Sequence, residues 1–118
     1  MSTRDPLSRA FAALADPTRR AILERLSAGD AGVVELAASS TLTQPAITKH
    51  LQVLERAGLI VRGREGQRRP ARLVLEGLHP VDDWIKGAQN DWTERLDRLE
   101  THLAATADST IMKESPSV

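Results

Sequence analysis

Apolar residues recur every three or four positions along the first quarter of the chain, which is the spacing of buried faces on α-helices. Two predicted helices open with the same signal, Asp5-Pro6 and Asp16-Pro17, in which aspartate caps the helix and proline takes its first position. Gly29 ends the second helix. The positions that we expect to be buried on these helices are Leu7, Ala10, Phe11, Leu14, Ile22, Leu23 and Leu26.

Two further helices are predicted in the middle of the chain. The valines of segment 33–38 would suit a strand, but a glutamate and two alanines favour a short helix. After a turn at residues 39–42, Thr43 caps a longer helix that has Pro45 in its first turn and ends before Gly58. The two helices are therefore joined by a tight turn.

A β-hairpin is predicted after the longer helix. Its strands are residues 59–64 and 69–75, joined by the turn Glu65-Gly66-Gln67, and Pro70 suits an edge position. The last helix runs from residue 81 to about residue 105.

The expected fold is mainly α with a small β-hairpin, in the order α-α-α-α-β-β-α. It forms one domain over residues 1–106, and residues 107–118 are predicted to be a flexible tail. A helix-turn-helix followed by a hairpin is the winged helix-turn-helix arrangement.

Composition excludes several classes of protein. The chain has 118 residues, 41% of them hydrophobic and 3% aromatic, and no cysteine, so disulfides and thiolate metal sites are excluded. The absence of a signal peptide and of a long apolar run predicts a cytoplasmic protein with no membrane partner. Without a nucleophile motif or a glycine-rich phosphate loop, we expect no enzyme and no cofactor. A metal site using His79 and His102 is a weak alternative, because the spacing fits no known ligand pattern.

Charge is unevenly distributed although the formal net charge is +0. Residues 44–72 hold seven bases and two acids, whereas residues 76–104 hold seven acids and three bases. One basic surface and one acidic helix therefore cancel in the sum. The sign of the local surface charge, rather than the net charge of the chain, decides whether a surface can bind a polyanion. The basic stretch therefore remains a candidate nucleic-acid surface.

The helix that begins after Thr43 has two distinct faces. Ile47, Leu51 and Leu54 fall within about 40° of one another on a helical wheel and form its core stripe. The opposite side is free of carboxylates and, with Gln44 in the exposed first turn, carries Pro45, Thr48, Lys49, Gln52 and Arg56.

This outward face has the chemistry of a major-groove reader. Glutamine pairs with adenine, lysine donates to guanine, and the threonine methyl contacts thymine. Thr43 and Arg56 are better placed for phosphate. Most polar helix faces are only solvated, so the argument depends on the short helix before this one and the basic hairpin after it.

The hairpin carries Arg62, Arg64, Arg68, Arg69 and Arg72, with little acid to balance them. Like charges on a short hairpin repel one another unless a polyanion compensates them. We therefore predict that Arg64, Gln67, Arg68 and Arg69 contact DNA. Arg62 and Arg72 fit salt bridges on the strands equally well.

Two stretches carry a family resemblance. FAALADPTRRAILERL, followed by LTQPAITKHLQVLERAGLIVRGREGQRRPARL, resembles the ArsR family of bacterial winged-helix regulators over roughly residues 6 to 105. The resemblance implies a homodimer that represses its own operon and is often released from double-stranded operator DNA by an effector. It also implies that Thr48, Lys49 and His50 lie at or near DNA, and that the hairpin is the wing.

The chain departs from the family's metal sensors. Their Cys-x-Cys motif is replaced by VVELAASS, and the last helix lacks their histidine and acid spacing. The resemblance therefore points to the cysteine-free branch, and we expect no metal.

Apolar residues of the last helix recur at steps of three and four, close to a heptad seam. Such a seam can pack on its own domain. A helix of this length spans about 37 Å, however, against about 26 Å for so small a domain, so part of the seam should meet a second copy. The predicted dimer interface combines this helix with the first one: Leu7, Phe11, Trp84, Ile85, Ala88, Trp92, Leu96, Leu99 and Leu103.

The function predicted from the sequence is a dimeric, sequence-specific DNA-binding repressor with a palindromic operator and an unidentified small-molecule effector. The alternative is a winged-helix protein-interaction module, in which the acidic last helix would be the docking face. Salt-dependent binding to duplex DNA distinguishes the two.

Overall fold

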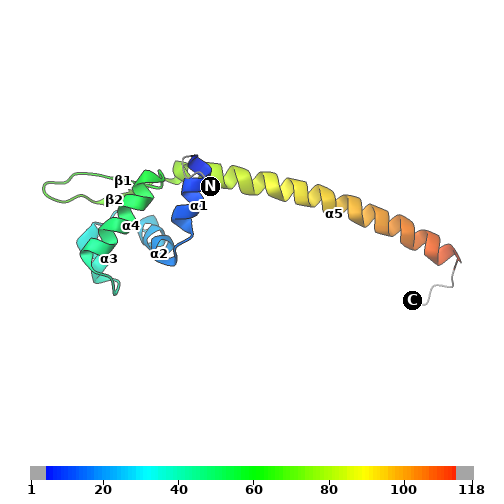
Figure 1. Cartoon of the computed structure of the whole chain (residues 1–118), viewed down its shortest axis with the longest axis horizontal. Coiled ribbons are helices and arrows are strands. Elements are labelled where there is room, and N and C mark those ends of the chain that lie inside the picture. Colours follow the sequence, from blue (N-terminus) through cyan, green and yellow to red (C-terminus); the bar gives the residue numbers. More distant parts are fainter. Residues whose placement is uncertain (1–4, 114–118) are drawn as a thin grey trace. The chain divides into compact units, whose positions relative to one another are not determined.

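The computed structural model describes residues 5–113, with side chains described as far as residue 107. The chain divides into two compact units, residues 1–82 and 83–118, and each is considered by itself. The elements follow one another in the predicted order, with one 3₁₀ turn added (Figure 1). The mainly helical winged helix-turn-helix prediction is thus confirmed.

The first two helices, α1 (Pro6–Leu14) and α2 (Pro17–Ser27), begin as their sequence predicts. The Asp5 carboxylate accepts a hydrogen bond from the Ser8 amide at 2.8 Å, and Asp16 accepts one from the Arg19 amide at 3.0 Å. The Arg19 side chain in turn donates to the carbonyls of Ala13 at 2.7 Å and Ala12 at 2.9 Å. One arginine therefore donates to two carbonyls in the last turn of α1, of which Ala12 also accepts from the Ala15 amide at 3.3 Å.

The two capping carboxylates should make stability depend on pH. The backbone N–H of Ser8 holds the pKa of Asp5 below its usual value, and that of Arg19 does the same for Asp16. Because the folded pKa is the lower one, this stabilisation is present above the unfolded pKa of about 3.9 and is lost as pH falls through the folded value. The double change Asp5→Asn and Asp16→Asn keeps capping side chains, and it should flatten the fall of the urea midpoint between about pH 5 and pH 2. An unchanged pH profile would contradict this assignment.

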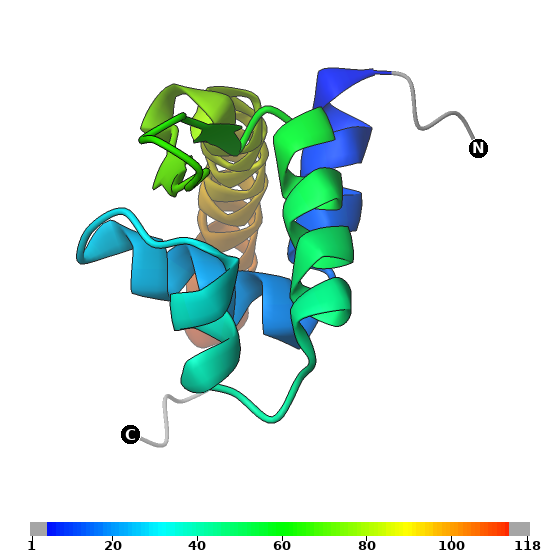
Figure 2. The same cartoon turned by 90° about the vertical axis from the view of Figure 1, so that its left-hand side faces the viewer.

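Helices α3 (Val33–Ala38) and α4 (Gln44–Arg56) form the helix-turn-helix. Ile47, Leu51 and Leu54 of α4 are 1%, 0% and 0% exposed, which confirms the predicted core stripe. Figure 2 shows α4 alongside α1, and α4 also contacts α2 and α3. The outward face of α4 is fixed by this packing.

On α1 the predicted buried stripe is partly wrong. Ala10 and Ala13 are fully buried, whereas Phe11 is 38% exposed and Leu7 and Leu14 are only half-buried. The small alanines let α1 approach its neighbours closely, and the large side chains lie at the margin of that contact.

Strands β1 (Ile60–Arg62) and β2 (Ala71–Leu73) pair antiparallel, with Ile60 opposite Leu73. Both are shorter than predicted, although the turn lies where expected, with Gly66 at φ 64°. The Gly63 amide still donates to the Pro70 carbonyl at 2.8 Å. Proline has no N–H to return that bond, so the ladder is interrupted there.

The connection to the last helix is the 3₁₀ turn η1 (Leu75–Leu78). Helix α5 runs from His79 to Lys113, beyond the predicted end near residue 105, so the predicted tail at 107–118 does not begin at a helix end. Residues 114–118 of that tail lie outside the described residues. Pro80 lies in the first turn of α5, where its missing N–H costs nothing. Within the described residues, no helix is both long enough and apolar enough to cross a membrane.

Candidate nucleic-acid interface

The outward face of α4 forms one side of a shallow depression in the protein surface. The hydroxyl of Thr43, the N-cap, accepts a hydrogen bond from the Ala46 amide at 3.3 Å and fixes the start of the helix. Most of the predicted base-reading residues line this depression together, and Val33 of α3 also lines it. Its lining is Val33, Gln44, Pro45, Thr48, Lys49 and Gln52.

His50 and Arg56 lie apart from this group. His50 Nδ1 is 3.9 Å from the Asp16 carboxylate and its side chain is 22% exposed, so the ring faces α2. Arg56 is exposed in the last turn of α4. His50 is therefore better placed to hold α4 against α2 than to read bases.

The tip of the wing, residues 63–70, carries a net positive charge, with three arginines and one glutamate. Glu65 and Arg68 exchange backbone hydrogen bonds of 2.9 and 3.0 Å around the turn. The side chains of Arg64, Arg68 and Arg69 are exposed, and they make no hydrogen bond or ion pair within residues 5–113. Free guanidinium groups of one sign on a projecting hairpin suit a phosphate backbone.

The other two arginines of the hairpin have structural roles, which separates them from the tip. Arg72 donates to the Asp30 carboxylate at 3.0 and 3.1 Å, and this partner raises the pKa of Arg72. Arg62 donates from Nε and Nη2 to the Arg69 carbonyl at 3.0 and 2.8 Å. Burial and then the nearby Arg69 charge lower the pKa of Arg62.

The base of the wing is also tied to the loop before α3. Ala31 and Ala71 form an antiparallel bridge, with the Ala71 amide donating at 2.8 Å and the Ala31 amide at 3.2 Å. Together with the ion pair between Asp30 and Arg72, this bridge sets the direction of the wing relative to the helix-turn-helix.

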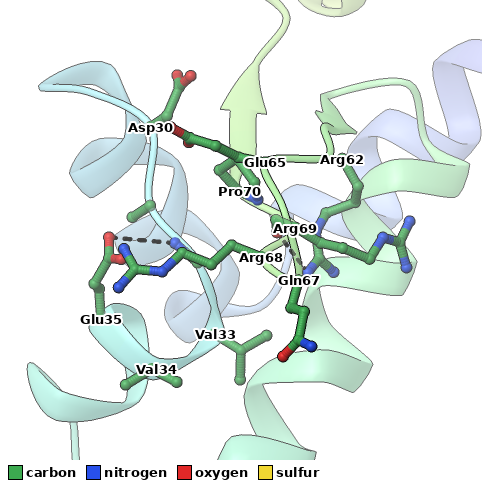
Figure 3. Close-up of a pocket in the computed structure, with 12 residues that line it drawn as sticks. Asp30, Val33, Val34, Glu35, Arg62, Glu65, Gln67, Arg68, Arg69 and Pro70 are labelled. Atoms are coloured by element: carbon green, nitrogen blue, oxygen red, sulfur yellow. Dashed lines mark hydrogen bonds between the residues drawn. The ribbon is translucent and has the colours of Figure 1, made fainter.

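A cavity of about 690 Å³ separates the wing from the start of α3 (Figure 3). Arg68 extends into it from the wing, and Val33 and Val34 line it from α3. Glu35 accepts a hydrogen bond from the Gly32 amide at 3.4 Å. Among the described residues, no three His, Asp or Glu side chains gather to hold a metal ion.

Residues 83–107 of α5 form a separate unit with a continuous apolar stripe at its surface. Each large residue of the predicted seam in this stretch is exposed by 41–62%: Ile85, Trp92, Leu96, Leu99 and Leu103, with Trp84 beside them at 54%. Ala88 is half-buried. Val81, which has the same helical spacing four residues before Ile85, belongs to the other unit and is 8% exposed.

Two residues at the candidate interface were not singled out from the sequence. Val33 was assigned only to a short helix, and Asp30 was assigned to no element. A valine at the first position of a helix gives no functional signal by itself, since its place beside α4 depends on how the two helices cross. An acid facing an arginine 42 residues later is equally invisible to local patterns.

Known proteins share this arrangement. A family profile described as a helix-turn-helix domain matches residues 14–63. The HTH-type transcriptional regulator Rv2034 of Mycobacterium tuberculosis is 46% identical over 78 residues, covering 66% of this chain and 73% of the relative. The transcriptional repressor SdpR of Bacillus subtilis is 38% identical over 61 residues, covering 52% of this chain and 68% of the relative.

Solved structures extend the likeness to about three quarters of the chain. The ArsR family transcriptional regulator RHA00566 superposes with a TM-score of 0.69 at 40% identity, covering 75% of this chain and 91% of that one. A homodimeric winged helix-turn-helix DNA-binding domain of Mycobacterium bovis gives a TM-score of 0.60 at 26% identity, covering 77% of this chain and 84% of that one. The chain therefore belongs to the ArsR family of transcriptional regulators, whose winged helix-turn-helix binds DNA.

Proposed function

We propose that this regulator is a dimeric repressor that binds a palindromic operator in its own promoter region, with α4 in the major groove and the wing on the DNA backbone. One observation carries the proposal. Val33 lines both the depression on the carboxylate-free face of α4 and the cavity that contains Arg68 and Arg69 of the wing, and the side chains of these arginines have no partner among the described residues. The relative SdpR is a transcriptional repressor, which supports repression rather than activation. We expect the protein to act in the cytoplasm, where its operator would lie.

The residues divide into two roles. The base-reading set is Gln44, Thr48, Lys49 and Gln52, with Pro45 between them in the depression. The backbone set is Thr43, Arg56, Arg64, Gln67, Arg68 and Arg69, all of them exposed. Phosphate contacts fix position and register, and base contacts supply the sequence preference.

A second copy would complete the molecule. We propose that the apolar stripe of α5, with Leu7 and Phe11 of α1, is the dimer interface. The exposed apolar side chains of the domain of residues 1–106 would then be buried only in the dimer. The homodimeric relative supports this assignment. A two-fold dimer sets two recognition helices about 34–36 Å apart, one turn of DNA. An effector that shifts α5 would alter this spacing and release the operator.

Binding to the chain's own upstream DNA tests the proposal. We expect the affinity to fall steeply as salt rises, with a log–log slope near −0.9 for each phosphate neutralised. Footprinting should show protection with two-fold symmetry. Failure to bind this or any other duplex at low salt would favour the protein-interaction module instead.

Single alanine variants should separate the two roles. Lys49→Ala and Gln52→Ala should each cost about 1–3 kcal/mol on the operator and relax preference at one base pair. Arg68→Ala should weaken all duplexes alike and reduce the salt slope by about 1. Arg9→Ala, an exposed arginine of α1, is the control and should leave binding unchanged. If all the α4 and wing variants lost operator and random DNA equally, this division would be wrong.

A further inference from the structure

The depression on the reading face is more than a gap between polar side chains. We propose that Val33 of α3, with Pro45 and Thr48 of α4, forms a seat for the 5-methyl group of thymine in the major groove. This inference rests on the proposed function and names the base that the site selects. It also gives α3 a direct part in sequence recognition.

The geometry places an apolar wall from α3 against the recognition helix. Val33 lines the depression together with Pro45 and Thr48, and it also packs against the buried core. Valine and proline are stiff side chains, and threonine carries a methyl group beside its hydroxyl. A wall that is anchored in the core keeps its shape when DNA arrives, so a small apolar group can be received without reordering the protein.

The other residues that line the depression are polar and match the rest of the same base pair. Gln44, Lys49 and Gln52 line it, and they provide amide and ammonium groups. A glutamine amide pairs with N6 and N7 of adenine, while the thymine opposite presents its methyl group and the O4 acceptor. Cytosine has no methyl group and offers a donor in place of O4. The combination therefore selects a T·A pair rather than any pyrimidine.

The adjacent valine provides a matched comparison. Val34 follows Val33 on α3 and is 65% exposed, but it does not line this depression. The two residues have the same side chain, so they differ only in position. If apolar surface affected DNA binding in general, truncating either valine would change it. A specific site for the thymine methyl group would be affected by Val33 but not by Val34.

Replacing thymine by uracil removes the methyl group and nothing else from the base pair. The probe is the tightest-binding duplex recovered from a randomised library with the full chain, resynthesised with uracil at each thymine in turn. At one symmetry-related pair of positions we expect a loss of about fourfold per methyl group, the value of burying one such group. Changing both half-sites together should cost about fifteenfold.

Variants then assign the methyl contact to α3. In Val33→Ala the ratio of thymine to uracil affinity at that position should fall from about four to near one. In Val34→Ala it should stay near four. Because each ratio is measured within one protein preparation, loss of folded protein does not alter it. Pro45→Ala, which removes another wall, should also lower the ratio.

Three outcomes would contradict the methyl site, the role of α3 or the proposed function. Equal affinity for thymine and uracil at every position overturns the methyl seat while leaving DNA binding intact. A thymine preference that persists unchanged in Val33→Ala overturns the role of α3. If the library yields no bound duplex, the proposed function fails first and the inference fails with it.

Discussion

Trp92→Ala is expected to turn the dimer into monomers at micromolar concentration and to lower operator affinity by a hundredfold or more. The indole is 62% exposed in the single chain and lies near the middle of the apolar stripe of α5. Truncating a buried aromatic anchor costs about 2–4 kcal/mol, and a two-fold interface contains it twice. Two linked DNA-binding domains bind roughly 10²–10⁴ times more tightly than either domain alone. Loss of the dimer therefore removes this increase in operator affinity.

Sedimentation velocity and operator titration measure the two effects together. Asn90→Ala is the matched control, since residue 90 is an exposed position on the same helix about 160° from Trp92. It should leave both mass and affinity unchanged. A Trp92→Ala protein that remains dimeric would move the interface away from α5, and a monomer that kept full affinity would show that dimerisation is not needed for binding.

The parts of the fold that follow from local rules were predictable. Aspartate followed by proline begins α1 and α2, and the spacing of Ile47, Leu51 and Leu54 defines the buried side of α4. Each signal depends on residues within one or two turns, so no knowledge of neighbouring elements is needed. The outward face of α4 follows directly, which is why most of the candidate site could be assigned.

The errors occur where distant segments decide the outcome. Phe11 has the spacing of a core residue on α1, but the neighbouring helices approach along the alanines and leave it 38% exposed. The contact of His50 with Asp16, 34 positions earlier and 3.9 Å away, could not be predicted from local spacing, while a DNA contact at His50 stays a prediction. Val33 lines the depression of the candidate site only because α3 lies beside α4. Local periodicity contains none of this information.

Gly77→Ala should destabilise the protein by about 3 kcal/mol or more, the upper end of what overpacking costs. A Cβ built at Gly77 would overlap the carbonyl group of Gly58 and lie 3.3 Å from the Cα of Leu59. All of these are backbone atoms, so no side chain can rotate away. The Gly58 backbone is itself held, since its amide donates to the Glu55 carbonyl at 3.0 Å and its φ is 76°. Relief therefore requires η1 to move away from the end of α4.

Thermal unfolding at matched protein concentration should show this as a midpoint lowered by more than about 10 °C, because 1 kcal/mol shifts a domain of this size by roughly 4–8 °C. Gly63→Ala is the control: its nearest neighbour would be Pro70 at 3.7 Å, an ordinary contact, so its midpoint should stay near that of the wild type. If Gly77→Ala unfolded at the wild-type temperature, η1 could not be packed against Gly58 in solution. The start of α5 would then be free to move relative to the end of α4.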